Sequence, residues 1–191
     1  MRFVQIFVIA TGGLIVLALF SLFLMGRRPD AGRVAGIVEL DAPPAAVMPW
    51  LVDASKLRQW VGWLADVKGD TTDATAGRQQ TWVMDDGTSS AVEMQVQLAA
   101  YAPPDSVRLR LRVPGLVEGT SRYVLEDLGG RTRLTVNSHY RHPNPAIALL
   151  EPLATPEAGA KLQKDLTRLR DRIAAAAQDT TTAPADSAAA H

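Results

Sequence analysis

The 191-residue chain contains no cysteine and only three histidines, and these scarcities narrow its chemistry. Without cysteine there is no disulfide, no thiolate nucleophile and no thiolate metal ligand. His139 and His142 lie three residues apart on an expected strand, so their side chains point to opposite faces and cannot chelate one metal ion. His191 is the last residue. We therefore expect no metal site and no cofactor, and we place His139 on the surface.

The chain also lacks an excess of charge of either sign, since Lys plus Arg and Asp plus Glu number 20 each. A nucleic-acid-binding domain typically carries a basic excess, so the composition argues against a nucleic-acid partner. No G-x-S-x-G motif is present, and we assign no catalytic residue. Asp66, Asp70 and Asp73 do not have the spacing of a calcium-binding loop, and we expect them to lie in a solvated turn.

One long segment, Phe3 to Met25, contains no charged residue at all over 23 positions. As a helix it spans about 34 Å, which is enough to cross a hydrocarbon core of ~30 Å. Arg27 and Arg28 follow it, without a signal-peptide cleavage pattern. We predict a single-pass cell-membrane anchor over residues 1–26 and a polar linker over 27–32. Basic residues flank the segment at both ends, so the side of the soluble domain is undetermined.

The segment after the linker has the patterns of an α+β domain. Residues 33–40 alternate as a strand, and two short helices follow, the first beginning at Pro43-Pro44 and bent by Pro49. Asp53 or Ser55 is placed to cap the second helix. Beyond residue 62, alternating segments separated by glycine- and proline-rich turns predict about six antiparallel strands.

The last part of the chain changes to helical spacing. Leu162, Leu166, Leu169 and Ile173 predict a long amphipathic helix that starts near Pro156. Residues 179–191 cannot bury enough apolar surface to order themselves, and we expect a disordered tail. A curved antiparallel sheet wrapped around one helix leaves an apolar space with a few polar groups, which is typical of a small-molecule pocket.

Two motifs resemble the SRPBCC superfamily, the START-related group that includes polyketide cyclase/dehydrase-like proteins. "IVELDAPPAAVMPWLVDASKLRQWVGWL" is similar to the opening of that family, and "L-x-x-D-L-x-x-L" near the end also agrees. The matching positions are Ala42, Pro43, Pro44, Val47, Asp53 and Trp60, and then Leu162, Asp165, Leu166 and Leu169. The resemblance implies a helix-grip fold over residues 33–178 with a cavity between sheet and helix. Pro49 and Trp50 depart from the family pattern, so we expect the cavity mouth to differ there.

The candidate ligand-binding residues are large aromatics and inward hydroxyls. The tryptophans could either fill the core or contact a flat apolar ligand. The hydroxyl groups come from the last two expected strands. The predicted set is Trp50, Trp60, Trp63, Trp82, Tyr123, Ser138 and Tyr140. On another strand Arg108, Arg110 and Arg112 alternate with apolar residues and are expected on the solvent face, with an anionic lipid or partner surface as the alternative.

Three functions follow from these patterns and from the resemblance. The favoured one is a membrane-tethered, non-catalytic domain that binds a lipid or other hydrophobic small molecule. The second is an interaction module whose cavity is filled by its own side chains. The third is a polyketide cyclase- or dehydratase-type enzyme, which requires a general acid or base in the cavity that the sequence does not identify.

Overall fold

The structure is a computed structural model that describes residues 17–21, 32–71, 73–85, 87, 91–148 and 151–182. Its element order is that of the predicted α+β domain. The elements are β1 (Arg33–Leu40), α2 (Pro44–Val52), α3 (Ala54–Trp60), β2 (Leu64–Gly69), β3 (Gln79–Met84), β4 (Val92–Ala102), β5 (Ser106–Val113), β6 (Val117–Asp127), β7 (Thr132–Arg141), α4 (Pro145–Ala148) and α5 (Glu151–Thr182).

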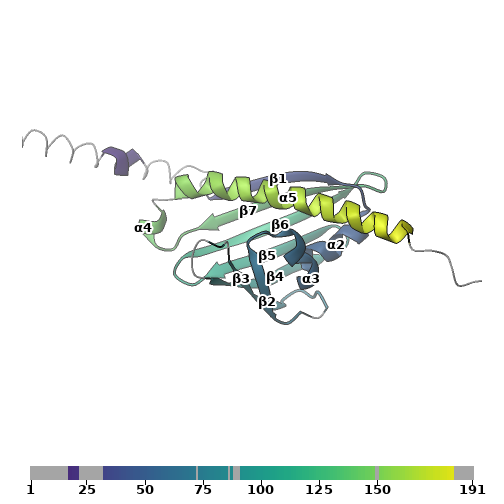
Figure 1. Ribbon diagram of the computed structural model, residues 1–191. Coiled ribbons are helices and arrows are strands. Elements are labelled where there is room, and N and C mark those ends of the chain that lie inside the picture. The colour runs from purple at the N-terminus through teal and green to yellow at the C-terminus, as the bar shows by residue number, and fades with distance from the viewer. Residues whose placement is uncertain are drawn as a thin grey trace, which may run out of the picture.

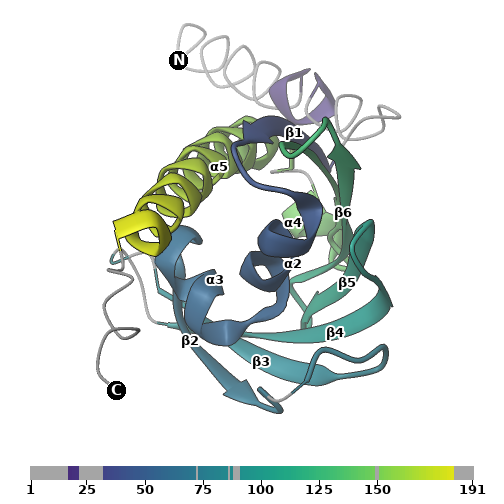
Figure 2. The same ribbon diagram turned by 90° about the vertical axis from the view of Figure 1, so that its right-hand side faces the viewer.

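The seven strands form one antiparallel sheet in the order β1-β7-β6-β5-β4-β3-β2. Strands β2 to β7 are joined as consecutive hairpins, and the last strand, β7, pairs with the first, β1. The sheet curves strongly, and α5 lies across its open side, against β1 and α3 (Figures 1 and 2). Helices α2 and α3 lie inside the curve of the sheet in the view of Figure 2. This arrangement confirms the expected curved sheet around a long C-terminal helix.

The helix pair forms where its local sequence predicts it. Helix α2 begins at Pro44, directly after Pro43, and continues through Pro49 to Val52. Of the two candidate caps of α3, Asp53 is the one used: its Oδ1 accepts hydrogen bonds from the backbone N–H and the hydroxyl of Ser55, both at 2.7 Å. The bond from the Ser55 hydroxyl is the main cause that holds the pKa of Asp53 below its usual value.

Helix α5 packs its apolar stripe into the sheet. Leu166 and Leu169 are fully buried, and an added Cβ at Gly36 of β1 would lie 2.6 Å from Leu166 Cδ1. Glycine is therefore needed for the close approach of β1 and α5. The helix starts at Glu151, earlier than predicted, because one internal proline, Pro156, removes only one backbone hydrogen bond from a long helix.

The predicted terminal segments fall largely outside the described residues. Of the expected anchor over residues 1–26, only 17–21 are described, and they are helical. Within the described ranges, no helix is both long enough and apolar enough to cross a membrane. At the other end, α5 continues to Thr182, four residues into the expected tail, and residues 183–191 are outside the described part.

Candidate functional site

A cavity of about 380 Å³ lies between the inner face of the sheet and α5. Most of its wall is apolar and comes from α3, β3, β4, β5 and β7. The apolar wall includes Trp60, Trp63, Trp82, Met84, Met94, Leu109, Leu111 and Val136. The polar lining residues are Ser121, Tyr123, Ser138, Tyr140, Lys161 and Asp165. The cavity therefore combines a hydrophobic wall with one group of polar side chains, as small-molecule sites do.

Three tryptophans build the aromatic part of the wall. The Trp60 side chain is held by a 2.9 Å hydrogen bond from its Nε1 to the carbonyl oxygen of Trp50. The rings of Trp63 and Trp82 lie with centroids 6.0 Å apart and planes tilted by 43°. Trp82 points inward because β3 alternates its faces, and its Nε1 donates to Gln80 Oε1 at 3.3 Å. These contacts hold the three rings in the cavity wall.

The polar group is built by two neighbouring strands. Ser121 of β6 faces Ser138 of β7 in the ladder, and their hydroxyl oxygens are 2.8 Å apart. The Tyr140 hydroxyl lies 3.5 Å from Ser121 Oγ. The period of two along each strand brings Tyr123 to the same inner face. The hydroxyl groups of Ser121, Ser138 and Tyr140 thus meet at one place on a mostly apolar wall.

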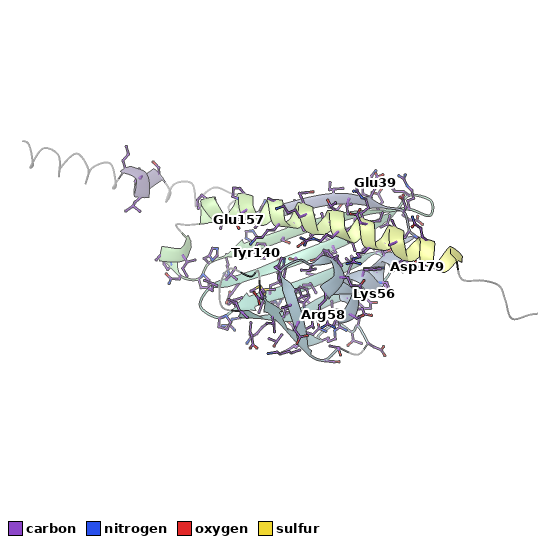
Figure 3. The ribbon with its side chains drawn as sticks, in the orientation of Figure 1. Glu39, Lys56, Arg58, Tyr140, Glu157 and Asp179 are labelled. Atoms are coloured by element: carbon purple, nitrogen blue, oxygen red, sulfur yellow. The ribbon has the colours of Figure 1, made fainter. Side chains whose placement is uncertain are left out.

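Gly119 makes room for the Tyr140 side chain. The two residues face each other across β6 and β7. An added Cβ at Gly119 would lie 2.6 Å from Tyr140 Cδ1 and 2.6 Å from the His139 carbonyl oxygen. Figure 3 shows Tyr140 beneath the part of α5 that carries Glu157. The glycine therefore lets the ring lie across β6, and this places the hydroxyl close to Ser121.

Tyr123 is a neutral hydroxyl group within the cavity wall. Burial raises the pKa of Tyr123 well above its usual value, and the negative charge of Asp165, with that of Tyr140 once it ionises, adds to the shift. The phenol therefore stays protonated at every physiological pH. It can donate a hydrogen bond to a bound molecule, but it cannot act as a base.

Asp165 is the carboxyl group of the cavity, and sequence reasoning missed it as a site residue. Its side chain is 7% exposed, and Oδ1 accepts hydrogen bonds from Gly62 N at 3.0 Å and Arg168 Nη1 at 2.9 Å. Burial raises the pKa of Asp165, while the Gly62 bond, the Arg168 charge and the Trp63 side chain oppose the rise. The sequence does indicate that Asp165 faces the sheet, because it follows Leu162 by three residues and so lies on the apolar stripe of α5.

Six of the seven predicted ligand-binding residues line the cavity, and the seventh, Trp50, does not. Trp60, Trp63, Trp82, Tyr123, Ser138 and Tyr140 all line the cavity. Trp50 is not among the described lining residues, and its expected place at the cavity mouth is wrong. Its side chain is in the core cluster, with Lys56 Nζ 5.4 Å from its ring centroid. Ser121, Lys161 and Asp165 line the cavity without having been predicted.

The residues expected outside the cavity are on the surface. His139 is exposed, and Arg108, Arg110 and Arg112 all point outward from β5. Within the described ranges, no three His, Asp or Glu side chains lie close enough together to hold a metal ion.

Comparison with known proteins identifies one matching family and several solved structures of the same fold. The family model described as polyketide cyclase/dehydrase and lipid transport matches residues 32–177. A conserved protein from Geobacillus kaustophilus is 15% identical, with 74% of this chain and 95% of that chain covered and a TM-score of 0.61. A protein from Arthrobacter aurescens is 17% identical, with 86% and 94% covered and a TM-score of 0.62. A protein from Thermus thermophilus is 18% identical, with 75% and 98% covered and a TM-score of 0.60. No curated protein matches the chain. At these identities the solved structures establish the fold alone.

Proposed function

We propose that this chain, which belongs to the polyketide cyclase/dehydrase and lipid transport family, is a membrane-tethered, non-catalytic binding domain for a lipid or other hydrophobic small molecule. The ligand lies in the cavity between the sheet and α5. The observation that carries the proposal is the cavity of about 380 Å³, whose lining is mostly apolar. This volume falls within the ~300–1,000 Å³ of small-molecule pockets.

The four hydroxyl groups that line the cavity give the ligand an orientation. Ser121 and Ser138 satisfy each other at 2.8 Å, and each hydroxyl oxygen keeps a further lone pair for an added donor. Tyr140 and the protonated Tyr123 can donate to a carbonyl or hydroxyl oxygen. A ligand with one such oxygen and an apolar body fits this lining, because its oxygen replaces the water that an empty polar end would hold.

The proposed tether is the apolar segment over residues 1–26. A tethered domain meets membrane-soluble molecules at a much higher effective concentration than a free domain would. This part of the proposal depends on the sequence alone, and fractionation tests it. Full-length protein that stays in solution without detergent contradicts the anchor, and it leaves the cavity proposal untouched.

The proposal is tested by recovering the bound molecule from the full chain. Native mass spectrometry and solvent extraction are applied to the wild type and to two variants at adjacent positions. Ser121→Phe fills the cavity, whereas Thr120→Phe adds the same ring to the exposed outer face of β6. Lipids carried over from the membrane occur equally in both variants, so the comparison removes them.

We expect one class of small molecule in the wild type and in Thr120→Phe, and its loss in Ser121→Phe. Thermal unfolding checks that Ser121→Phe is folded, and Val117→Trp, which also lines the cavity, is the second blocking variant. A wild-type protein that carries no molecule, and that shows no thermal shift with lipids or quinones, contradicts the binding function. That result favours the interaction module.

One observation favours a cyclase- or dehydratase-type enzyme as the second candidate. Asp165 lines the cavity, and burial raises its pKa toward the range of a general acid. Its Oδ1 is occupied by Gly62 and Arg168, which is the arrangement of a structural clamp. The recovered ligand separates the two functions, because a dehydratase yields a product one water lighter from the wild type than from Asp165→Asn. Identical masses rule out a dehydration that depends on Asp165. A cyclase that isomerises its substrate leaves the mass unchanged, and it is detected instead as a difference in chromatographic retention between the two recovered ligands.

A further inference from the structure

The outer face of the sheet carries two rows of side chains that contain arginine and no carboxylate. The strand registers place Arg33 beside His139, His139 beside Thr120, and Thr120 beside Arg110, so these residues form one row across β1, β7, β6 and β5. In the next row Arg122 of β6 lies directly opposite Arg108 of β5. We call Arg33, Arg108, Arg110 and Arg122 the arginine patch.

The arginine patch differs from the other arginines of the same face. At the two ends of the sheet, Arg112 pairs with Glu118, and Arg133 pairs with Glu39 and Glu126. Within the described part of the chain, no residue of the arginine patch forms an ion pair. The Arg110 side chain donates a hydrogen bond to the neutral Gln97, at 3.0 Å.

The positive charges of the arginine patch destabilise the folded sheet. Like charges directly opposite each other across a ladder destabilise a sheet, and Arg108 and Arg122 are such a pair. An anion bound over the patch would remove the repulsion, since guanidinium groups bind phosphate oxygens in a bidentate manner. The patch is therefore complementary in charge to a phosphate-bearing partner. This complementarity is local, because the whole chain has no net charge.

Two further observations select a membrane surface among anionic partners. Ile37, on the same outer face and four residues along β1 from Arg33, is 62% exposed, and an exposed apolar side chain on a face that carries arginines is typical of contacts at the lipid interface. Arg33 follows Met25, the end of the apolar segment, by eight residues. Eight residues span at most about 28 Å. The patch is therefore within reach of the bilayer that the segment is predicted to enter.

We propose that the outer face of the sheet, through Arg33, Arg108, Arg110 and Arg122, docks onto the anionic phospholipid headgroups of the membrane. Docking holds the sheet against the bilayer and turns α5 away from it. This inference goes beyond the proposed function, since it concerns the face opposite the cavity and requires no ligand.

The experiment uses the absence of cysteine, which makes a single introduced thiol the only labelling position. A polarity-sensitive dye is placed on Thr120→Cys, inside the patch, or on Ala160→Cys, on the exposed side of α5. The full chain is reconstituted in vesicles of phosphatidylcholine alone or mixed with phosphatidylglycerol. We expect a shift to apolar emission at position 120 only, only with phosphatidylglycerol, and reversed by raising the salt from about 0.1 M to about 1 M.

Two triple variants of equal charge loss show whether the patch itself is responsible. Each arginine near an anionic surface contributes about fivefold to binding. Three changes in the patch therefore weaken the docked state on the order of a hundredfold, as measured by titrating phosphatidylglycerol into the vesicles. The patch variant is Arg108→Gln, Arg110→Gln and Arg122→Gln. The control variant, on α5, is Lys164→Gln, Arg170→Gln and Arg172→Gln, and it should retain docking.

The outcomes of this experiment separate docking from the anchor and from other partners. Flotation of the vesicles on a density gradient shows whether the chain is bound to them. A chain that floats only with vesicles containing phosphatidylglycerol supports docking, even where the anchor fails. An emission at position 120 that is the same in both vesicles overturns docking, even where the chain is membrane-inserted. Equal weakening in the two triple variants also overturns it, because the effect is then net charge alone. A response to an acidic polypeptide but not to phosphatidylglycerol overturns the choice of a membrane.

Discussion

Asp165 connects the cavity to the packing of α5, and its replacement by asparagine tests how the buried carboxylate acts. Asparagine keeps an oxygen that can accept the Gly62 N–H, which lies 3.0 Å from Asp165 Oδ1. It removes the charge that attracts Arg168 and the cost of burying that charge. A leucine at the same position has a similar size and removes the acceptor as well. The pair of variants therefore separates the hydrogen bond from the charge.

The expected magnitudes follow from exposure and geometry. The Arg168 side chain is 50% exposed, so its pairing with Asp165 contributes at most about 0.5 kcal/mol. Relief of desolvation offsets part of that loss in Asp165→Asn, and we expect its unfolding free energy to fall by less than about 1 kcal/mol. Asp165→Leu leaves the Gly62 N–H without its acceptor and costs about 1–3 kcal/mol. Urea unfolding of the full chain measures both values.

The raised pKa of Asp165 determines how the stability difference between the wild type and Asp165→Asn changes with pH. The folded state binds this proton more tightly than the unfolded state, whose Asp pKa is near 3.8. As the pH falls from 7 through the folded pKa toward 3.8, the wild type therefore gains stability relative to Asp165→Asn. Above the folded pKa, and below 3.8, the difference is constant. A wild type that instead loses stability relative to Asp165→Asn on acidification refutes burial as the dominant effect.

Substitutions at three other positions test the local arguments. Gly119→Ala forces the Tyr140 ring to move, costs about 1–3 kcal/mol in thermal unfolding, and weakens binding of the extracted ligand; an unchanged affinity contradicts the role of the glycine. Asp53→Ala removes the cap that accepts from Ser55 and costs about 1 kcal/mol, whereas Asp53→Asn costs less. Because the pKa of Asp53 is lowered, its stabilising effect is present above pH 3.8 and is lost as the pH falls through the folded pKa, as urea unfolding at several pH values can check. Leu169→Ala empties a fully buried position of α5 and costs about 2–5 kcal/mol; a loss below about 1 kcal/mol argues against tight packing of α5 on the sheet.

The sequence was most informative where structure depends on near neighbours. Pro43-Pro44 and Asp53 predicted the boundaries of the helix pair, because a missing N–H and a capping carboxylate act within one turn. The alternation of apolar residues predicted the strands and their inner faces, and it placed Tyr123 and Tyr140 on the wall of a cavity. These predictions needed no knowledge of which strands pair.

The prediction was incomplete where a residue's role depends on a distant partner. Trp50 departs from the family pattern, and this places it near the cavity mouth in the prediction, but α2 packs it into the core. Asp165 was read only as part of a helical motif, because its partner Gly62 lies 103 positions away in the sequence. The hydroxyl pair of Ser121 and Ser138 depends on the register of β6 and β7, which alternation alone does not determine.

By itself the sequence determined the order of elements, the faces of the strands, the apolar stripe of α5 and the charge-free segment near the start of the chain. These properties are local, since they depend on periodicity, backbone donors and the composition of short windows. Only the tertiary structure decided that a cavity is present between sheet and helix, that a carboxyl group lines it, and that four arginines share two rows without a carboxylate. Each of these depends on the registers of the seven-stranded sheet and on the packing of α5, which bring together residues that the sequence keeps far apart.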